Sequence, residues 1–221
     1  MSMEMLFFVE GRDNGVWKSC DNLRLVGDPM SFDVVGNDFY KGSNEELFAM
    51  LAGLDPQRIN TIAHARGLPK DLSPELTDVV EQVFRPGTAA SWLSLVELLV
   101  FDWEQKLEIR ATVNGPVYEQ WSRSDPERDY HPPVDSISNR KPRIRISERT
   151  MAADITSIKK RHSPDQWGTM IEQELGNCFC NVTRSWTYAQ KAGSFYNQTL
   201  PRMEEQGISE DVRCVFWFVE E

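Results

Sequence analysis

The sequence predicts an α+β fold, in which a mixed or antiparallel central sheet contains the N- and C-terminal strands and helices pack on it. Two segments lead to this prediction, residues 5–9 (MLFFV) and 212–219 (VRCVFWFV), one near each end of the chain. Both are apolar at successive positions, as strands are when a sheet is covered on both faces. The 221 residues, 40% of them hydrophobic, are enough for one sizeable core, so we expect a single domain over residues 1–221.

The first strand is expected to turn back in a hairpin. Residues 11–15 (GRDNG) are a strong turn signal, and residues 16–18 (VWK) resume an extended pattern. The first twenty residues therefore predict two neighbouring strands.

Four helices are expected, over residues 44–52, 73–84, 91–104 and 188–203. Ser43 with Glu46 forms a capping-box pattern before the first of them. Ser73 followed by Pro74 marks the start of the second, because proline is favoured at the first helical position.

The third helix begins at Ser91 or Ser94 and is apolar enough to be the buried one. Four of its side chains share a face at helical spacing: Leu95, Leu98, Leu99 and Trp103. A strand-like segment, residues 178–186, precedes the fourth helix.

Residues 122–165 are expected to form a polar insertion or subdomain. Four prolines fall between residues 122 and 143, among charged and small polar residues. This composition is typical of a long loop or of a subdomain junction.

The net negative charge of the chain excludes some classes of binding partner and favours others. It has 34 acidic and 24 basic side chains, a net charge of −10. Non-specific nucleic-acid binding depends on cations that neutralise phosphates, so we exclude it, whereas a basic protein surface is a suitable partner.

No apolar run reaches the ~20 residues that span a bilayer, and the N-terminus lacks the cationic region of a signal peptide. We expect a cytoplasmic protein with no membrane partner, and the oligomeric state stays open.

One stretch of this acidic chain is basic. Residues 139–162 hold eight basic and two acidic residues, so this window carries +6 and the remainder −16. Alternation over residues 143–146 puts two arginines on one strand face, where their guanidinium groups suit a phosphate or carboxylate. The alternative is a solvated edge strand whose charges deter aggregation. The predicted binding residues are this pair, two flanking cations and two aromatic stacking surfaces: Arg143, Arg145, Arg140, Lys141, Trp121 and Tyr130.

No metal or cofactor is predicted. The chain has no Gly-rich phosphate loop and no metalloprotease motif, and its three histidines lie in different segments: His64, His131 and His162. Cys178 and Cys180 would project to one strand face, with Cys214 on another strand as a third thiol. Two thiols alone do not complete a tetrahedral site, so buried structural cysteines are the preferred interpretation.

Carboxylates are too plentiful to mark an active site. Glu97 interrupts the apolar face of the third expected helix, and Asp102 and Glu104 lie near its end. Glu97 could have a raised pKa and transfer protons, or it could accept backbone hydrogen bonds or pair with an arginine. No catalytic residue is predicted.

Four segments carry a resemblance to a known family. They are MSMEMLFFVE at the N-terminus, LFAMLAGL followed by ARGLPKDLS, SWLSLVELLVFDW, and LPRMEE followed by DVRCVFWF near the C-terminus. These segments resemble the motifs MGCDIHxxVE, LFAxLAGV with RGLPxDxS, SWLTLxELLxYDW, and LPxLxxL with VRIVFWFD. The motifs belong to an uncharacterised family of bacteria, mainly actinobacteria, and their phages. The resemblance covers most of the chain apart from about residues 120–175, and it implies organisation and no particular activity.

The chain departs from that family at positions that could carry chemistry. The family's opening has Cys, Asp and His where this chain has Met3, Glu4 and Leu6. Histidines often precede the family's SWL motif, where this chain has Thr88 and Ala90. If those side chains form a catalytic or metal centre in relatives, this chain is a non-catalytic member that is retained for binding.

Two functions follow. The first is a non-catalytic phage or mobile-element accessory protein that binds a host macromolecule or a nucleotide-like ligand, with inhibition of a bacterial defence system as one such role. The second is a hydrolase of a phosphate-containing substrate, with carboxylates as metal ligands or bases. The missing side chains and the uneven charge favour the first.

Overall fold

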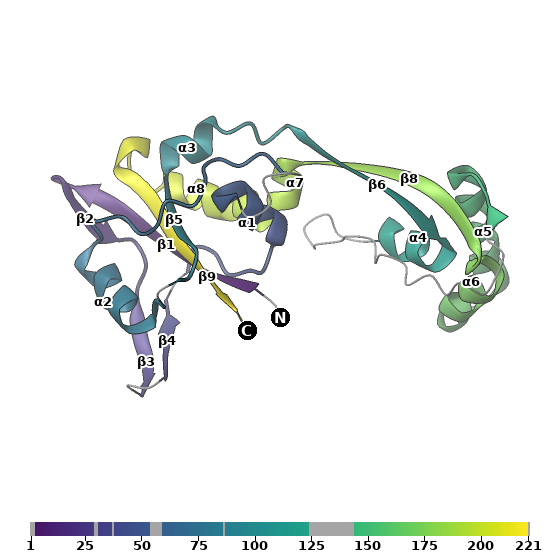
Figure 1. The fold of residues 1–221 in the computed structure, drawn as a ribbon, viewed down its shortest axis with the longest axis horizontal. Helices are drawn as coiled ribbons and strands as arrows, with labels where there is room; N and C mark the ends of the chain where they lie inside the picture. Colours follow the sequence, from purple (N-terminus) through teal and green to yellow (C-terminus); the bar gives the residue numbers. More distant parts are fainter. Residues whose placement is uncertain are drawn as a thin grey trace. The chain divides into compact units, whose positions relative to one another are not determined.

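The computed structural model describes residues 3–28, 31–36, 38–53, 59–85, 87–123 and 144–220. The chain folds into two compact units, and each has its own sheet (Figure 1). Unit 1 consists of Met1–Gln105 and Tyr188–Glu221, and unit 2 consists of Lys106–Thr187. No helix within the described residues is long and apolar enough to span a membrane.

Unit 1 is built on a four-stranded antiparallel sheet in the order β2-β1-β9-β5. Its strands are β1 (Met3–Asp13), β2 (Val16–Ser19), β5 (Ala90–Ser94) and β9 (Val212–Glu220). β1 and β9 pair from Met3↔Glu220 to Gly11↔Val212, which places the two ends of the chain side by side. The prediction that the first and last strands are neighbours in a central sheet is confirmed, and so is the α+β class.

One face of this sheet is covered by helices from both halves of unit 1. Phe7 of β1 meets the ring of Phe195 edge-on, with 5.6 Å between the ring centroids. Phe218 of β9 meets Phe48 of α1 (Glu45–Ala52) at 5.0 Å. All these side chains are buried, so the face forms the larger part of the core.

The opposite face carries a second apolar cluster. Phe8 and Trp217 stack there with 4.8 Å between their ring centroids, and they pack with Leu76 and Val79 of α2 (Pro74–Val83). β1 and β9 are therefore covered on both sides, which is why their sequences are apolar at successive positions.

The first hairpin turns through two residues. Asn14 and Gly15 both have positive φ, 51° and 81°, as a type I′ turn requires. β1 continues to Asp13, so the turn is shorter than the expected 11–15. A second hairpin, β3 (Arg24–Asp28) with β4 (Ser31–Val35), was not predicted.

The first two helices form where the sequence places them. α2 has Ser73 as its N-cap and Pro74 in its first turn, as predicted. α1 is capped by Asn44, whose side chain accepts a hydrogen bond from the Leu47 amide, so the predicted capping box of Ser43 with Glu46 is wrong. Glu46 is instead buried and forms an ion pair with Lys191 at 2.9 Å.

The prediction for residues 91–104 is only partly right. Residues 90–94 form β5, which pairs with β9, and the helix α3 spans only Leu95–Val100. Ser94 ends the strand and caps the helix through a capping box with Glu97. Strand pairing prevails over helical spacing here because Trp92 and its neighbours lie against β9. Trp103 is buried beyond the end of the helix, whereas Leu99 is 41% exposed.

The predicted helix over residues 188–203 forms as three consecutive parts. They are α7 (Tyr188–Ala192), the π-helical turn η2 (Phe195–Thr199) and α8 (Leu200–Glu204). A short 3-10 turn, η3 (Ser209–Asp211), then leads into β9.

Unit 2 has a three-stranded sheet in the order β6-β8-β7 and three α-helices within its described residues. β6 and β8 are antiparallel, and β7 runs parallel to β8. The elements are β6 (Lys106–Asn114), α4 (Gly115–Ser122), β7 (Ile144–Arg145), α5 (Glu148–Arg161), α6 (Trp167–Leu175) and β8 (Cys178–Thr187).

Unit 2 contains residues 122–165, where the sequence predicts an insertion, but it is larger. It begins at Lys106 because β6 and β8 pair from Lys106↔Thr187 to Asn114↔Phe179 and close the unit. Its helices also bury an apolar core, to which α5 contributes Met151, Ile155 and Ile158. Three apolar residues at helical spacing were thus enough to hold α5 in place within a polar segment.

Candidate functional site

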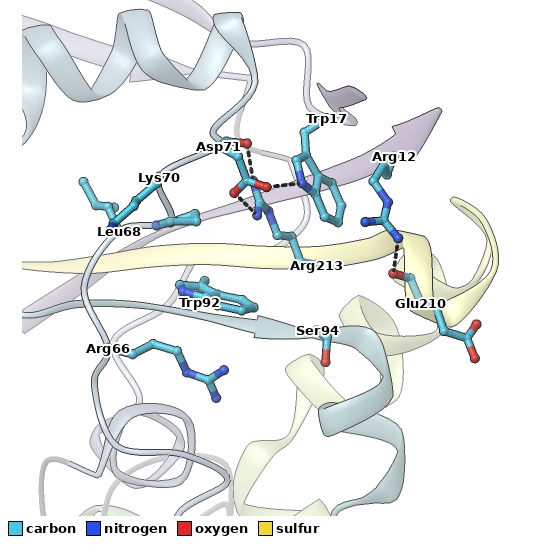
Figure 2. Close-up of a pocket in the computed structure, with 11 residues that line it drawn as sticks. Arg12, Trp17, Arg66, Leu68, Lys70, Asp71, Trp92, Ser94, Glu210 and Arg213 are labelled. Atoms are coloured by element: carbon cyan, nitrogen blue, oxygen red, sulfur yellow. Dashed lines mark hydrogen bonds and ion pairs between the residues drawn. The ribbon is translucent and has the colours of Figure 1, made fainter. Parts of the chain in front are cut away.

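A cleft of about 540 Å³ opens at one end of the sheet in unit 1 (Figure 2). It lies between the loop at residues 66–71 and the ends of four strands or their connections. Its lining is unusually rich in arginine and tryptophan: Arg12, Trp17, Arg66, Leu68, Pro69, Lys70, Asp71, Trp92, Ser94, Glu210 and Arg213.

Strand register brings the central cleft residues together. Arg213 of β9 lies opposite Glu10 of β1 on one side and Ser94 of β5 on the other. Arg12 of β1 pairs with Trp17 of β2. Alternate residues of a strand share a face, so this set continues the face that Phe8 and Trp217 occupy farther along the sheet. The cleft is therefore the polar end of an otherwise apolar sheet face.

Arg213 is the centre of this arrangement and is only 3% exposed. Its Nε donates to Oε2 of Glu10 at 2.7 Å, and its Nη1 donates to Oδ1 of Asp71 at 2.8 Å. Its Nη2 donates to the Asp71 carbonyl, also at 2.8 Å. The guanidinium carbon lies 3.9 Å from the ring centroid of Trp17, and Figure 2 shows the two side chains against each other. Four contacts hold this guanidinium in one position.

Two carboxylates fix Arg213 to the loop that walls the cleft. Glu10 is buried, and its second oxygen accepts a hydrogen bond from the Ser73 amide at 2.7 Å, just before α2. Asp71 also accepts a hydrogen bond from Trp17 Nε1 at 2.9 Å. The hydrogen bond from Arg213 holds the pKa of Asp71 below its usual value. Asp71 is thus ionised and structural, and is not a proton donor at neutral pH.

A second arginine and tryptophan lie across the cleft. The guanidinium of Arg66 is 4.7 Å from the ring centroid of Trp92, and its Nη2 donates to Glu97 at 2.7 Å. Burial raises the pKa of Glu97, but the hydrogen bonds from Arg66 and Ser94 outweigh it and lower the pKa overall. A raised pKa of Glu97, one of the alternatives that the sequence leaves open, is contradicted. The alternative, in which Glu97 pairs with an arginine, is what the structure shows.

The rim of the cleft carries two further cations. Arg12 donates to Asp211 at 2.8 Å and lies 5.2 Å from the Trp17 ring centroid, on the same indole that Arg213 contacts. Lys70 is exposed and forms no ion pair with the residues that the structure describes. Lys70 can therefore bind an anion without breaking an ion pair to another described residue.

The lining offers little for catalysis. Ser94 is its one hydroxyl, and that hydroxyl donates at 2.9 Å to Glu97, a carboxylate whose lowered pKa makes it a weak base. No histidine or cysteine lines the cleft. Across the described part of the chain, no three His, Cys, Asp or Glu side chains gather in a way that could hold a metal ion. The arrangement can position a ligand, but it lacks an activated nucleophile.

The two predicted binding residues that the structure describes, Trp121 and Arg145, do not line the cleft. Arg140, Lys141, Arg143 and Tyr130 fall outside the described residues. Arg145 is exposed on β7, the short edge strand of unit 2.

Trp121 has a different environment from the one that the sequence suggested. It is 3% exposed within the core of unit 2, with Arg184 5.5 Å from its ring centroid. Its ring is used in packing and does not form a stacking surface for a ligand.

The cysteines do not form a common site. Cys214 is buried in unit 1, and burial raises its pKa to about 12. Cys180 is buried in unit 2, and burial raises its pKa to about 11. Cys178 is partly exposed, with its pKa also raised by burial. Thiols held in the protonated form are poor nucleophiles and metal ligands.

Sequence reasoning did not find the cleft, although two signals were present. Glu10 and Arg213 are charged residues in or next to the two apolar segments that are predicted to be strands buried on both faces. A charged side chain in such a strand is almost always paired with an opposite charge. What the sequence could not show is that they pair with each other, since they are 203 positions apart.

Comparison with protein-family models, curated proteins and solved structures finds no match to this chain. The geometry of the cleft is therefore the basis for assigning a function.

Proposed function

We propose that this protein is a non-catalytic binding protein and that the unit 1 cleft binds a nucleotide-like ligand, with a planar ring and an anionic group. The observation that carries this proposal is the lining of the cleft. Two tryptophans and four cations surround about 540 Å³, a volume within the range of small-molecule sites.

The anionic group would be bound at the Arg66 and Lys70 side of the cleft. The guanidinium of Arg66 donates only from Nη2 within the described residues, which leaves its donors on Nε and Nη1 for a ligand. Lys70 adds an ammonium group without an ion pair in that part of the chain. Guanidinium and ammonium donors together are a common means of binding phosphate in proteins.

The planar group would be bound by the tryptophans and their arginines. Trp17 and Trp92 are partly exposed, and each carries a guanidinium group close to its ring. Indole rings and guanidinium planes both stack on nucleobases. Because Arg213 is fixed by Glu10 and Asp71, this part of the site is rigid before the ligand arrives, which reduces the entropy lost on binding.

The biological setting of the proposal comes from the sequence. The resemblance to a family of bacteria and their phages supports an accessory role in a bacterial cytoplasm. A phage protein that sequesters a nucleotide-like ligand there would deprive a host defence system of it.

The test is titration calorimetry with a panel of nucleoside mono-, di- and triphosphates. We expect one class to bind, and the double variant Arg66→Gln/Lys70→Ala to weaken that binding about tenfold or more, because charge-assisted hydrogen bonds contribute about 1.5–3 kcal/mol each. The matched control is Lys160→Ala/Arg161→Gln in unit 2, where Arg161 is likewise paired, with Glu174 at 2.9 Å. The control should bind like the wild type.

Three results would refute the proposal. The first is that no nucleotide binds. The second is that the cleft variant binds normally while Arg145→Ala abolishes binding, which would assign the site to the basic stretch of unit 2. The third is steady hydrolysis of the bound nucleotide, detected by chromatography of the mixture, which would make the protein an enzyme.

A further inference from the structure

A second hollow in unit 1, separate from the cleft, lies between α3 and the C-terminal helical segment. Its volume is about 310 Å³. Except for one amide and one carboxylate, its lining is apolar or aromatic: Leu99, Trp103, Tyr196, Asn197, Leu200, Pro201 and Glu204. We call this hollow the α3–α8 groove, and it shares no residue with the cleft.

One lining residue of the groove is an exposed apolar side chain, and two more exposed apolar residues lie on or beside elements that pack with its walls. Leu99 is 41% exposed and its neighbour Val100 is 77% exposed, although both lie on a helix of six residues. Ile208, 67% exposed, directly precedes η3, which packs on α3. An exposed apolar side chain that lines a hollow marks an interaction surface more often than one on a flat surface.

One wall of the groove has unusual backbone geometry. Tyr196 and Asn197 lie in η2, a π-helical turn between α7 and α8. Such turns are rare and occur frequently at functional sites. A continuous α-helix would rotate these two side chains to other positions around the helix axis.

The charges beside the groove are acidic. Glu204 is the charged residue of its lining, and Glu205, Asp102 and Glu104 are exposed next to lining residues in the sequence. Arg202, the cation of α8, is engaged elsewhere, because it donates to the Asp38 carbonyl at 2.7 Å and lies 4.6 Å from the Phe39 ring centroid. An occupant therefore needs an apolar face with basic residues beside it.

The walls also determine the backbone conformation of the occupant. α3, η2 and α8 are helical and contain no strand, so these walls offer no strand edge to which an extended peptide could add. An occupant must satisfy its own backbone hydrogen bonds, as a helix does.

We propose that the α3–α8 groove is a docking site for an amphipathic, basic helix of a partner protein. The apolar side chains of that helix would lie against Leu99, Tyr196 and Leu200, and its lysines or arginines would face Glu204 and the neighbouring acids. This proposal does not depend on the function of the cleft.

The test uses a labelled helical peptide of leucine and lysine, about 18 residues long, with leucines on one face, and measures fluorescence anisotropy. The variant is Leu99→Lys/Val100→Lys, which places one cation in the groove lining and a second at the next residue of α3. The matched control is Val26→Lys/Val35→Lys, which adds the same charge at two exposed valines of β3 and β4. We expect the groove variant to bind about tenfold or more weakly, and the control to bind like the wild type.

Each alternative result would overturn the proposal. The first is equal loss in both double variants, which would show that the peptide responds only to the overall charge of the protein. The second is unchanged binding by the groove variant, and the third is equal binding of a leucine and glutamate peptide. A dimer in sedimentation of the protein alone that the groove variant dissociates would assign the groove to a second copy. If the double variant does not fold, Glu204→Lys, at an exposed position, makes the same test through the rim charge.

Discussion

The two units of this protein differ in how their sheets are covered, and the difference is visible in their strands. In unit 1 the central strands have helices on one face and α2 with its apolar cluster on the other, so successive residues of β9 are buried. In unit 2 the helices cover one face. Cys180 and Val182 of β8 are buried there, whereas Asn181 and Thr183 are exposed. A strand that is apolar at successive positions is thus covered on both faces, whereas a strand that alternates apolar and polar residues is covered on one.

The units also differ in charge. Counted over the sequence, unit 1 carries −12 and unit 2 carries +2. Both hollows described here lie in unit 1, the acidic unit. Three of its arginines, Arg12, Arg66 and Arg213, form ion pairs with carboxylates, and the guanidinium of each lies beside a tryptophan of the cleft. Three changes test whether the two units differ as much in energetics as in structure.

The largest expected effect is that of Arg213→Ala in unit 1. It leaves the buried carboxylate of Glu10 without its partner, and removing one member of a buried pair costs about 3–5 kcal/mol. We expect the free energy of unfolding of unit 1 to fall by that amount, as measured by urea denaturation followed by tryptophan fluorescence.

The control for this change is the double variant Glu10→Gln/Arg213→Met. A neutral amide can still accept the hydrogen bond from the Ser73 amide, and methionine fills the arginine's space without a charge. Most of the stability should return. A double variant as unstable as Arg213→Ala would show that the loss came from packing against Trp17 and not from an unpaired charge.

The second effect is a dependence of stability on pH that belongs to unit 1. Burial raises the pKa of Asp21 to about 6, although its carboxylate accepts hydrogen bonds from the Val9 and Asp38 amides. Because the folded pKa exceeds the ordinary value of 3.8, the folded protein binds this proton more tightly than the unfolded chain. The resulting stability is present below about pH 4 and is lost as the pH rises through 6, a change of about 3 kcal/mol.

This dependence is measured by comparing unfolding free energies of the wild type and Asp21→Asn between pH 4 and 7. The variant cannot titrate at this position, so the wild type should lose about 3 kcal/mol relative to it over that range. Parallel curves would show that Asp21 has an ordinary pKa in the folded state. Asp21 lies in unit 1, so this loss is expected in the unfolding of that unit.

The sequence predicted unit 1 far better than unit 2, for a physical reason. The strands at the two ends are apolar at successive positions, and helix starts such as Ser73 with Pro74 are marked locally. β5 was missed because residues 91–94 also fit a helical spacing, and the pairing with β9 that makes them a strand is a long-range contact. The segment of unit 2 that contains α5 looked polar because only every third or fourth residue of that helix is buried.

The candidate site could be predicted less well than the fold. The sequence predicts a local cluster of cations at residues 140–145, since a sequence shows directly only the proximity of residues that are close along the chain. The cleft joins residues from β1, β2, β5, β9 and the loop at 66–71, and only the sheet register brings them together. Predicting Arg213 beside Trp17 would have required the strand order first.

The smallest expected effect is that of Arg184→Ala in unit 2, the counterpart of Arg213→Ala. Arg184 pairs with Glu148 at 2.7 Å and lies 5.6 Å from the Tyr118 ring centroid, so its contacts resemble those of Arg213. The difference is exposure: the side chains of Arg184 and Glu148 are 27% and 38% exposed. Water can solvate Glu148 when its partner is removed, so the free energy of unfolding should fall by only about 1 kcal/mol or less. A loss as large as that of Arg213→Ala, in the same urea titration, would mean that ion pairs matter equally in both units and that burial of Glu10 is not what makes Arg213 important.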